Sequence, residues 1–425
     1  MTGSDTGTGK LGILVGGGPA PGINGVIAAA TTEAVRHGLS VVGILDGFKW
    51  LAQGDTTHVR KLTLQDAEEC RAKGGSILST SREKPADDPE KMKLVVGALD
   101  QIGISYLVTI GGDDTAYTAL KTAETSAGRI RVAHVPKTID NDLPLPDQAP
   151  TFGYNTARAV GAELVANLME DARTTKRWFL VVAMGRSAGH LALGMARSGG
   201  ASLAVIPEEL GGNASLDLVL SVIEGSMHKS KVMGRDYGVA VVAEGVGELL
   251  VKELEGRPYV EITKDKSGNL RLAEVPLALI LKRELQARLK ARNRKMTIVD
   301  ITIGYEMRCA SPIAFDAEYV QQLGWAAVQY LLGLRPEWGT GGALMALRAG
   351  NVEPIPFTKI LDPATGKTAV RRVDVKSDSY LSARAAMIRL QKADLEDTDL
   401  LSKLADTAGL SPEEYRTAYA AAANV

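Results

Sequence analysis

Short apolar runs, each followed at once by glycine or acidic residues, recur along this sequence. Runs of about four to eight apolar residues bounded by turn residues indicate buried strands. Strands that alternate with helical stretches predict an α/β fold with a mostly parallel sheet, in which ligands bind at the carboxyl ends of the strands. The residues directly after each run are therefore the functional candidates. The expected strands are 11–15, 41–45, 106–110, 132–135, 177–183, 203–207, 238–243 and 297–303, and the expected helices are 26–37, 116–127, 154–171, 216–228, 276–293 and 315–332, with a helical tail from Leu381.

Length and charge limit what the chain can be. At 425 residues it exceeds what one hydrophobic core supports, so we expect two domains. The 49 Lys and Arg residues balance the 50 Asp and Glu residues, which gives no reason to expect nucleic acid or an anionic membrane as a partner. No run approaches the roughly 18 apolar residues of a membrane helix. Cys70 and Cys309 match no zinc or disulfide framework, so we expect a cytoplasmic protein.

Three loops in the first 115 residues suit phosphate groups. Residues 16–25, GGGPAPGING, lie between a strand and a helix, which presents backbone N–H groups to a phosphate. The loop lacks the lysine and the spacing of nucleotide fingerprints, so it is weak evidence alone. Residues 74–82 offer hydroxyls and Arg82, either as phosphate ligands or as a solvated loop. The paired glycines before Asp113 let the backbone approach a ligand, and Asp113 is placed to reach Mg²⁺ directly or through water.

The segment 136–144, PKTIDNDLP, follows the fourth expected strand. Its second proline disfavours helix, so we expect an extended chain in which Thr138, Asp140 and Asp142 share one face. Lys137 then lies on the other face. Two carboxylates this close need a metal, a cation or a shared proton. One use of such a pair is a base that activates an alcohol near a metal, and the alternative is an Asx-rich turn that caps the strand.

Comparable groups follow strands in the second half of the chain. Residues 184–190, MGRSAGH, open a helix and place Arg186 where a helix N-terminus would help it to hold an anion. Glu244 stands at the end of another strand. A basic cluster at the end of the helix 276–293 is either a solvated helix face, or a subunit contact or sugar-phosphate site. The cluster consists of Arg288, Lys290, Arg292, Arg294 and Lys295.

Taken in order, the motifs GGGPAPGIN, GGDDT, PKTIDND, MGRSAGH and GYEMR, together with Glu244, resemble the phosphofructokinase family. They span roughly residues 11–325, and the last hundred residues match no family motif. The resemblance implies two Rossmann-like three-layer domains with mostly parallel sheets and an active site in the cleft between them. It implies Mg²⁺-dependent transfer of a phosphoryl group to the 1-hydroxyl of fructose 6-phosphate, which gives fructose 1,6-bisphosphate.

The resemblance also implies residue roles. Asp140 matches the general base, and Asp113 matches the aspartate that is associated with magnesium. The donor-binding residues are then Gly18, Arg82, Asp113, Asp114 and Lys137. The substrate-binding residues are Thr138, Ile139, Asp140, Arg177, Met184, Gly185, Arg186, Glu244, Tyr305 and Arg308. We expect Asp140, Lys137, Asp114 and Arg186 to take part in catalysis.

Two departures from the nucleotide-using members concern the phosphoryl donor. Asp114 stands where those members have a second small residue, and Lys137 stands where they often have glycine. Both resemble the pyrophosphate-dependent branch. The physics agrees, because a carboxylate at Asp114 would crowd and repel a nucleotide α-phosphate, while Lys137 adds positive charge for a compact donor. The alternative is a Lys–Asp pair with a purely structural function.

Two other departures concern the sugar phosphate. Tyr305 stands where ATP-using members usually have histidine. By the resemblance, Arg177 matches an arginine that reaches the sugar phosphate across a subunit interface. Val299 stands where those members usually have a second such arginine. Arg294 or Lys295 could take the place of this missing second arginine. The resemblance implies a homodimer or a homotetramer.

Several other activities fit some of these features. They are an ATP-dependent 6-phosphofructokinase, the same chemistry on sedoheptulose 7-phosphate, a lipid or dinucleotide kinase that shares only the GGD loop, and a silent sugar-phosphate sensor, which would normally have lost Asp140 or Asp113.

The expected domains are a flexible N-terminus at 1–10, a donor-binding domain at 11–153, a sugar-phosphate-binding domain at 154–315 and a C-terminal helical region at 316–425 that packs back on the domains.

Overall fold

The chain divides into two compact units, each made of two stretches of sequence. A computed structural model describes residues 9–255, 275–339, 341–359 and 369–425. The first unit comprises Met1–Ala157 and Tyr305–Arg371, and the second comprises Arg158–Gly304 and Arg372–Val425. The expected C-terminal region 316–425 therefore contributes to both units. Of the N-terminus predicted to be flexible, residues 1–8 lie outside the described residues.

The first unit is built on one large sheet. Its strand order is β12-β11-β5-β4-β1-β2-β3, and β6 pairs with β5. The interior pairs are parallel, whereas β3 and β12 at the two edges run antiparallel to their neighbours. The strands are β1 Lys10–Val15, β2 Val41–Ile44, β3 Val59–Leu62, β4 Ile104–Gly111, β5 Arg131–Thr138, β6 Phe152–Gly153, β11 Ala343–Arg348 and β12 Asn351–Pro356, and the helices are α1 Ile23–Arg36, α2 Leu64–Cys70, α3 Pro89–Ile102, α4 Asp113–Thr125, α12 Tyr305–Arg308 and α13 Ala314–Leu331.

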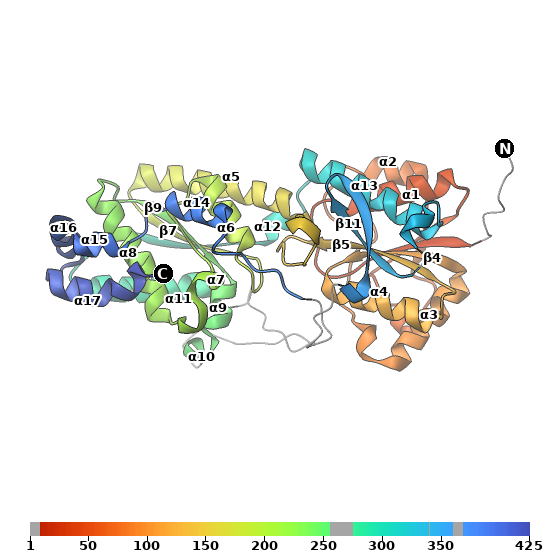
Figure 1. Cartoon of the computed structure of the whole chain (residues 1–425), viewed down its shortest axis with the longest axis horizontal. Coiled ribbons are helices and arrows are strands. Elements are labelled where there is room, and N and C mark those ends of the chain that lie inside the picture. Colours follow the sequence, from red (N-terminus) through yellow and green to blue (C-terminus); the bar gives the residue numbers. More distant parts are fainter. Residues whose placement is uncertain (1–8, 256–274, 340, 360–368) are drawn as a thin grey trace. The chain divides into compact units, whose positions relative to one another are not determined.

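Helices cover both faces of this sheet. Along β1, Leu11, Ile13 and Val15 pack with α1 and α13, whereas Leu14 packs with α3 and α4 on the other face. This alternation follows from the two-residue period of a strand. Figure 1 shows α1 and α13 on one side of the sheet and α3 and α4 on the other. The burial of β1 on both faces explains why it reads as a continuous apolar run.

The second unit has a smaller, fully parallel sheet with the order β10-β7-β9-β8. Helices α8 and α11 pack on one face in a single apolar cluster, and the C-terminal helices α16 and α17 pack on α8. The strands are β7 Trp178–Ala183, β8 Leu203–Val205, β9 Gly238–Ala243 and β10 Ile298–Ile303, and the helices are α5 Tyr154–Thr175, whose first turn belongs to the first unit, α6 His190–Gly199, α7 Pro207–Leu210, α8 Leu216–Val232, α9 Gly245–Leu249, α10 Val251–Leu254, α11 Leu277–Ala291, α14 Asp378–Ala385, α15 Lys392–Glu396, α16 Thr398–Ala408 and α17 Pro412–Ala423.

The structure confirms the α/β prediction, and the expected strands and helices occur within a few residues of their predicted bounds. The strand at 297–303 is not the last, however, because β11 and β12 follow it. The sequence pattern does not predict β12, because Pro354 and Pro356 lie in it and proline usually indicates a turn. Proline is tolerated there because β12 is an edge strand, where a missing N–H disrupts no central ladder. Among the described residues, no helix is long and apolar enough to cross a membrane.

Candidate functional site

Three strand ends meet at one edge of the first sheet. β1, β4 and β5 are parallel neighbours, with Val15 paired to Ile110 and Gly111 paired to Pro136. Their carboxyl ends are therefore side by side. Gly18 follows β1, Asp113 and Asp114 begin the helix after β4, and Lys137 lies at the end of β5. A backbone bridge between Gly16 and Ser81 brings the Arg82 segment to the same edge. The structure thus brings together four segments that are far apart in the sequence.

Asp113 and Asp114 form the acidic first turn of α4. Gly112 is the N-cap residue, so both carboxylates lie at the positive end of the helix dipole. Asp114 makes an ion pair of 2.6 Å with the Nζ atom of Lys84, and the Lys84 side chain is only 18% exposed. Lys84 belongs to no motif, and no pattern in the sequence indicated it. The ion pair therefore holds the positively charged ammonium group of Lys84 next to the GGD turn.

A buried histidine on β5 also supports the GGD turn, by a hydrogen bond to its first glycine. His134 on β5 donates from Nε2 to the carbonyl of Gly111 at 3.1 Å, so its Nδ1 accepts from the hydroxyl of Thr109 at 2.8 Å. Burial, together with the charge of the neighbouring Lys137, lowers the pKa of His134 to about 3, although its hydrogen bond to Gly111 acts in the opposite direction. His134 is therefore neutral at physiological pH and holds the strand end by hydrogen bonds alone.

Lys137 and Arg308 both reach the glycine loop after β1. The Nζ atom of Lys137 donates to the carbonyl of Gly18. Arg308, on α12, lies so close to Gly18 that a Cβ at residue 18 would overlap its guanidinium group. Burial lowers the pKa of Arg308, and Asp140 opposes this effect, which places the carboxylate near the guanidinium. Two cations thus approach the backbone that we expect to bind a phosphate.

The Nε atom of Arg308 is buried and makes no hydrogen bond to any described residue. A buried donor of this kind is unfavourable unless a ligand or water completes it. An anion in the glycine loop would do so. The guanidinium also lies over the ring of Tyr305, 5.6 Å from its centre, and Tyr305 is itself 70% exposed.

The predicted extended chain at Lys137–Asp142 is wrong beyond Thr138. The strand ends there, and Asn141 adopts a left-handed conformation with φ of 58°. Asparagine tolerates this region better than other residues with a Cβ, and a single left-handed residue breaks the two-residue alternation. Asp140 and Asp142 therefore cannot be placed on one face by strand geometry. The hydroxyl of Thr138 instead accepts from the backbone N–H of Asp140 at 3.0 Å, and Asp140 is only 8% exposed.

In the second unit, Met184, Gly185 and Arg186 follow the carboxyl end of β7 and Glu244 follows that of β9. The two strands are parallel neighbours. One carboxylate oxygen of Glu244 accepts from the backbone N–H of Gly185 at 3.0 Å and of Arg186 at 2.6 Å. The structure therefore brings these four predicted residues together. Arg186 has φ of 50° and precedes α6 by several residues, so the prediction that it lies at a helix N-terminus is wrong.

Arg177 is not near that group. It immediately precedes β7, whereas Met184 follows it, and a strand of this length separates its two ends by roughly 20 Å. Arg177 lies beside Thr297, because the N–H of Trp178 donates to the Thr297 carbonyl. Its Nε atom is buried, makes no hydrogen bond to any residue that the structure describes, and lies 3.8 Å from a carboxylate oxygen of Asp171. Arg177 therefore cannot act on the same ligand as Arg186 of its own unit.

The basic cluster after α11 serves mainly the packing of the second unit. Arg288 and Arg292 both pair with Glu224, whose side chain is fully buried on α8. Arg292 also donates to the hydroxyl of Tyr419 on α17 at 2.7 Å, and Arg294 donates to the carbonyl of Asp406. The prediction of a solvated helix face is therefore wrong for Arg288 and Arg292, whereas Lys290, Arg294 and Lys295 are exposed.

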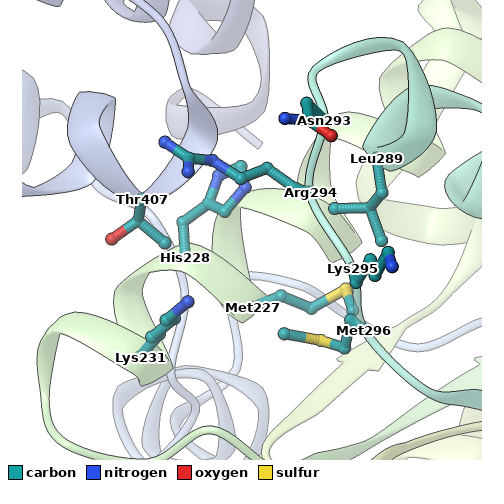
Figure 2. A pocket seen from close by; sticks show the side chains of 9 residues that line it. All are labelled: Met227, His228, Lys231, Leu289, Asn293, Arg294, Lys295, Met296 and Thr407. Carbon is teal, nitrogen blue, oxygen red and sulfur yellow. The ribbon is translucent and has the colours of Figure 1, made fainter.

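A pocket of about 340 Å³ lies beside this cluster. Figure 2 shows Lys231 reaching it from α8 and Arg294 from the segment after α11. Its other lining residues are Met227, His228, Leu289, Asn293, Lys295, Met296 and Thr407.

Motif analysis missed the residues that hold the functional loops. Arg371 donates from its side chain to Asn141 and Ala149, and Arg372 donates to the carbonyl of Ser187. Glu208 accepts from the N–H of Gly189 at 3.0 Å. These contacts join residues that are far apart along the chain, and no spacing rule predicts them. Their only sequence signal is charge.

Comparison with known proteins shows the family of this chain. The phosphofructokinase family model matches residues 10–331. A protein of Thermotoga maritima named pyrophosphate–fructose 6-phosphate 1-phosphotransferase is 52% identical over 96% of this chain and 98% of its own length. A protein of Naegleria fowleri with the same name is 44% identical over 95% and 94%. An ATP-dependent 6-phosphofructokinase 3 of Streptomyces coelicolor is 30% identical over 83% and 95%.

Solved structures show the same fold. A pyrophosphate-dependent phosphofructokinase from Marinobacter aquaeolei superimposes with a TM-score of 0.65 at 18% identity, over 87% of this chain and 88% of that one. The phosphofructokinase from Saccharomyces cerevisiae gives 0.65 at 20% identity over 97% of this chain, which spans 50% of the yeast chain. The family model and the close relatives cover most of the chain, and this protein belongs to the phosphofructokinase family.

Proposed function

We propose that this protein transfers a phosphoryl group from pyrophosphate to the 1-hydroxyl of fructose 6-phosphate. The products are fructose 1,6-bisphosphate and phosphate. The observation that carries the proposal is the close, full-length likeness to two proteins named for this reaction. Asp114 and Lys137 differ from the residues of nucleotide-using members. Asp114 lies in the first turn of α4, directly after β4, and Lys137 lies at the carboxyl end of β5, which is paired with β4.

In this mechanism Asp140 is the general base. It accepts the proton of the 1-hydroxyl as the oxygen attacks the phosphorus atom. Phosphoryl transfer needs little covalent chemistry from the protein, and the remaining work is alignment and charge balance. Lys137, Arg82 and Arg308 supply positive charge to the donor, and the backbone at Gly18 borders the same phosphates.

The proposal includes Mg²⁺ held by Asp113 together with oxygen atoms of the diphosphate. Mg²⁺ usually binds one or two carboxylates plus substrate phosphates rather than a cage of protein ligands. The described residues contain no group of three or more His, Cys, Asp and Glu side chains that could hold a metal, which fits such a substrate-dependent site. The ion would neutralise charge that develops on the phosphates.

The second unit supplies the sugar-phosphate site in this proposal. Met184, Gly185 and Arg186 contact the sugar phosphate, and Glu244 fixes their loop. Arg177 is supplied by a second copy of the chain, because it lies roughly 20 Å along β7 from Met184. The protein is therefore a homodimer or a homotetramer.

Asp114 excludes nucleotides by its charge. Its ion pair with Lys84 holds the carboxylate in place at the first turn of α4. A nucleotide α-phosphate at that position would face a negative charge, whereas pyrophosphate ends before it.

A coupled assay of the purified protein tests the proposal. Formation of the sugar bisphosphate is followed with pyrophosphate or ATP as donor. Fructose 6-phosphate as acceptor gives fructose 1,6-bisphosphate, and sedoheptulose 7-phosphate gives sedoheptulose 1,7-bisphosphate. We expect turnover with pyrophosphate and fructose 6-phosphate that depends on Mg²⁺, and little with ATP. Strong ATP turnover would overturn the donor, and preference for sedoheptulose 7-phosphate would overturn the acceptor.

A further inference from the structure

Two consecutive arginines hold the two functional loops. The first, Arg371, is 9% exposed and comes from a distant part of the chain. Its Nε donates to the carbonyl of Asn141 at 3.0 Å, its Nη1 donates to the carbonyl of Ala149 at 2.9 Å, and its Nη2 donates to the Asn141 side chain. Its backbone N–H donates to the carbonyl of Asp142 at 2.6 Å. All these acceptors belong to the loop after β5.

The loop needs such a donor because its backbone leaves the sheet. After Thr138 the carbonyl groups have no ladder partner, and Asn141 is in the left-handed region. Buried carbonyls without a donor are costly. A guanidinium group has five N–H donors in a fixed planar arrangement and can satisfy several acceptors together, which an ammonium group cannot do with the same geometry.

The side chain of Asn141 connects this anchor to the strand. Its Oδ1 atom accepts from Arg371 and from the backbone N–H of Thr151 at 3.1 Å. The hydroxyl of Thr151 in turn donates to the carbonyl of Thr138 at 2.9 Å. Asp140 lies between these fixed points, so its position depends on both.

The next residue performs the corresponding function in the second unit. The Nη1 of Arg372 donates to the carbonyl of Ser187 at 2.8 Å, in the loop after β7 that contains Arg186. The N–H of Val373 donates at 3.0 Å to the carboxylate oxygen of Glu208 that also accepts from Gly189.

We propose that Arg371 is a positioning residue for Asp140 and that Arg372 is a positioning residue for the Arg186 loop. The inference rests on the proposed function, because it assumes that Asp140 acts as the base. Arg371 acts through the Ile139–Asp142 turn, to which it donates its hydrogen bonds. Arg371 variants should therefore change the chemical step, while Arg372 variants should change sugar-phosphate binding.

Steady-state kinetics of the full chain test the proposal, with pyrophosphate and fructose 6-phosphate as substrates. We expect Arg371→Lys, which keeps the charge but loses the planar arrangement of donors, to lower kcat by up to about 100-fold, as for small misplacements of a catalytic group. The KM for fructose 6-phosphate should stay within a few-fold. We expect Arg372→Met to raise that KM roughly 2–10-fold, the usual effect of one hydrogen bond, with little change in kcat. Arg129→Met, which removes an exposed ion pair with Asp100, is the matched control and should behave as wild type.

A double-mutant cycle separates positioning from a merely structural function. If Arg371 acts through Asp140, Arg371→Lys should lower kcat much less in an Asp140→Asn background than in the wild type. The acidic limb of the kcat–pH profile should also shift in Arg371→Lys, because the environment of the base changes. Equal losses in both backgrounds, an unchanged pH profile or an unchanged kcat would each overturn the positioning function of Arg371, and an unchanged KM in Arg372→Met would overturn that of Arg372.

The same experiment distinguishes this inference from the proposed function. If Asp140→Asn alone keeps wild-type kcat, the assignment of the base fails. If Asp140→Asn is inactive while Arg371→Lys is fully active, only the positioning inference fails.

Discussion

The two functional loops are held by groups of opposite charge. The loop after β5 carries Asp140 and Asp142, and a buried arginine binds its carbonyls. The loop after β7 carries Arg186, and the carboxylates of Glu244 and Glu208 accept from its N–H groups. The charge of Arg371 offsets that of the first loop. In the second loop, Glu244 and Glu208 offset the charges of Arg186 and of its other anchor, Arg372. A loop with concentrated charge is easier to order when its fixed neighbour has the opposite sign.

The largest effect should come from Asp140, the proposed general base in the loop after β5. We expect Asp140→Asn to lower kcat by about 10²–10⁴-fold, the usual contribution of a general base, with the sugar-phosphate KM within a few-fold. Asp147→Asn is the control in the same loop, since Asp147 is exposed and pairs with Arg348. Wild-type turnover by the Asp140 variant would remove this residue from the mechanism.

The next largest effect should come from the residues that bind the phosphoryl donor. Lys137→Met should weaken the pyrophosphate reaction by about 10–150-fold, since a hydrogen bond to a charged group contributes roughly 1.5–3 kcal/mol. Asp114→Gly should let ATP use appear or rise and lower pyrophosphate use, and the two changes should be non-additive. Initial rates with each donor give the answer. An Asp114→Gly enzyme that still rejects ATP would refute exclusion by charge.

The anchor of the second loop should give a smaller effect that is confined to the acceptor. Glu244→Ala leaves the N–H groups of Gly185 and Arg186 without their acceptor, which costs about 1–3 kcal/mol for a buried donor. We expect a higher fructose 6-phosphate KM, an unchanged pyrophosphate KM and a lower Tm. Glu244→Gln keeps an acceptor oxygen and should lie between Glu244→Ala and wild type. A change in the pyrophosphate KM instead would contradict the division of the two loops.

The smallest effect concerns acid stability, because each unit contains one buried neutral histidine. Burial lowers the pKa of His134 in the first unit and of His228 in the second to about 3. Since an unfolded histidine binds a proton near pH 6.5 and the folded one does not, stability is complete above about pH 6.5 and falls as the pH drops toward 3. The expected slope is about 1.4 kcal/mol per pH unit for each histidine.

Urea unfolding at pH 7.5 and pH 5.5 checks this expectation. Between pH 7.5 and pH 5.5 the wild type should lose free energy of unfolding. His134→Gln and His228→Gln should each reduce this loss by roughly the contribution of one histidine. An unchanged pH dependence in both variants would show that other groups cause the acid sensitivity.

The sequence predicted the positions of functional groups better than their supports. Strand ends were recognisable because apolar runs and glycines are local signals, and so Asp113, Lys137 and Glu244 all follow predicted strands. The sequence predicts an extended chain at Asn141, whereas this residue has a left-handed φ and its side chain bonds to Thr151 and to Arg371, 230 residues away. The anchors Arg371 and Lys84 stand outside any motif. A long-range contact leaves no periodic trace in one sequence.

The order of the strands affects how the protein folds during synthesis. In the first sheet β5 lies between β4 and β11, yet β11 is made about 200 residues after β5. At usual rates of translation this delay is roughly 10–40 s. During that time the nascent chain exposes an unpaired strand edge and the apolar face that α13 later covers. The chain is therefore open to edge-to-edge aggregation until residues 314–348 leave the ribosome, and holdase chaperones that shield strand edges should improve its yield more than those that act after release.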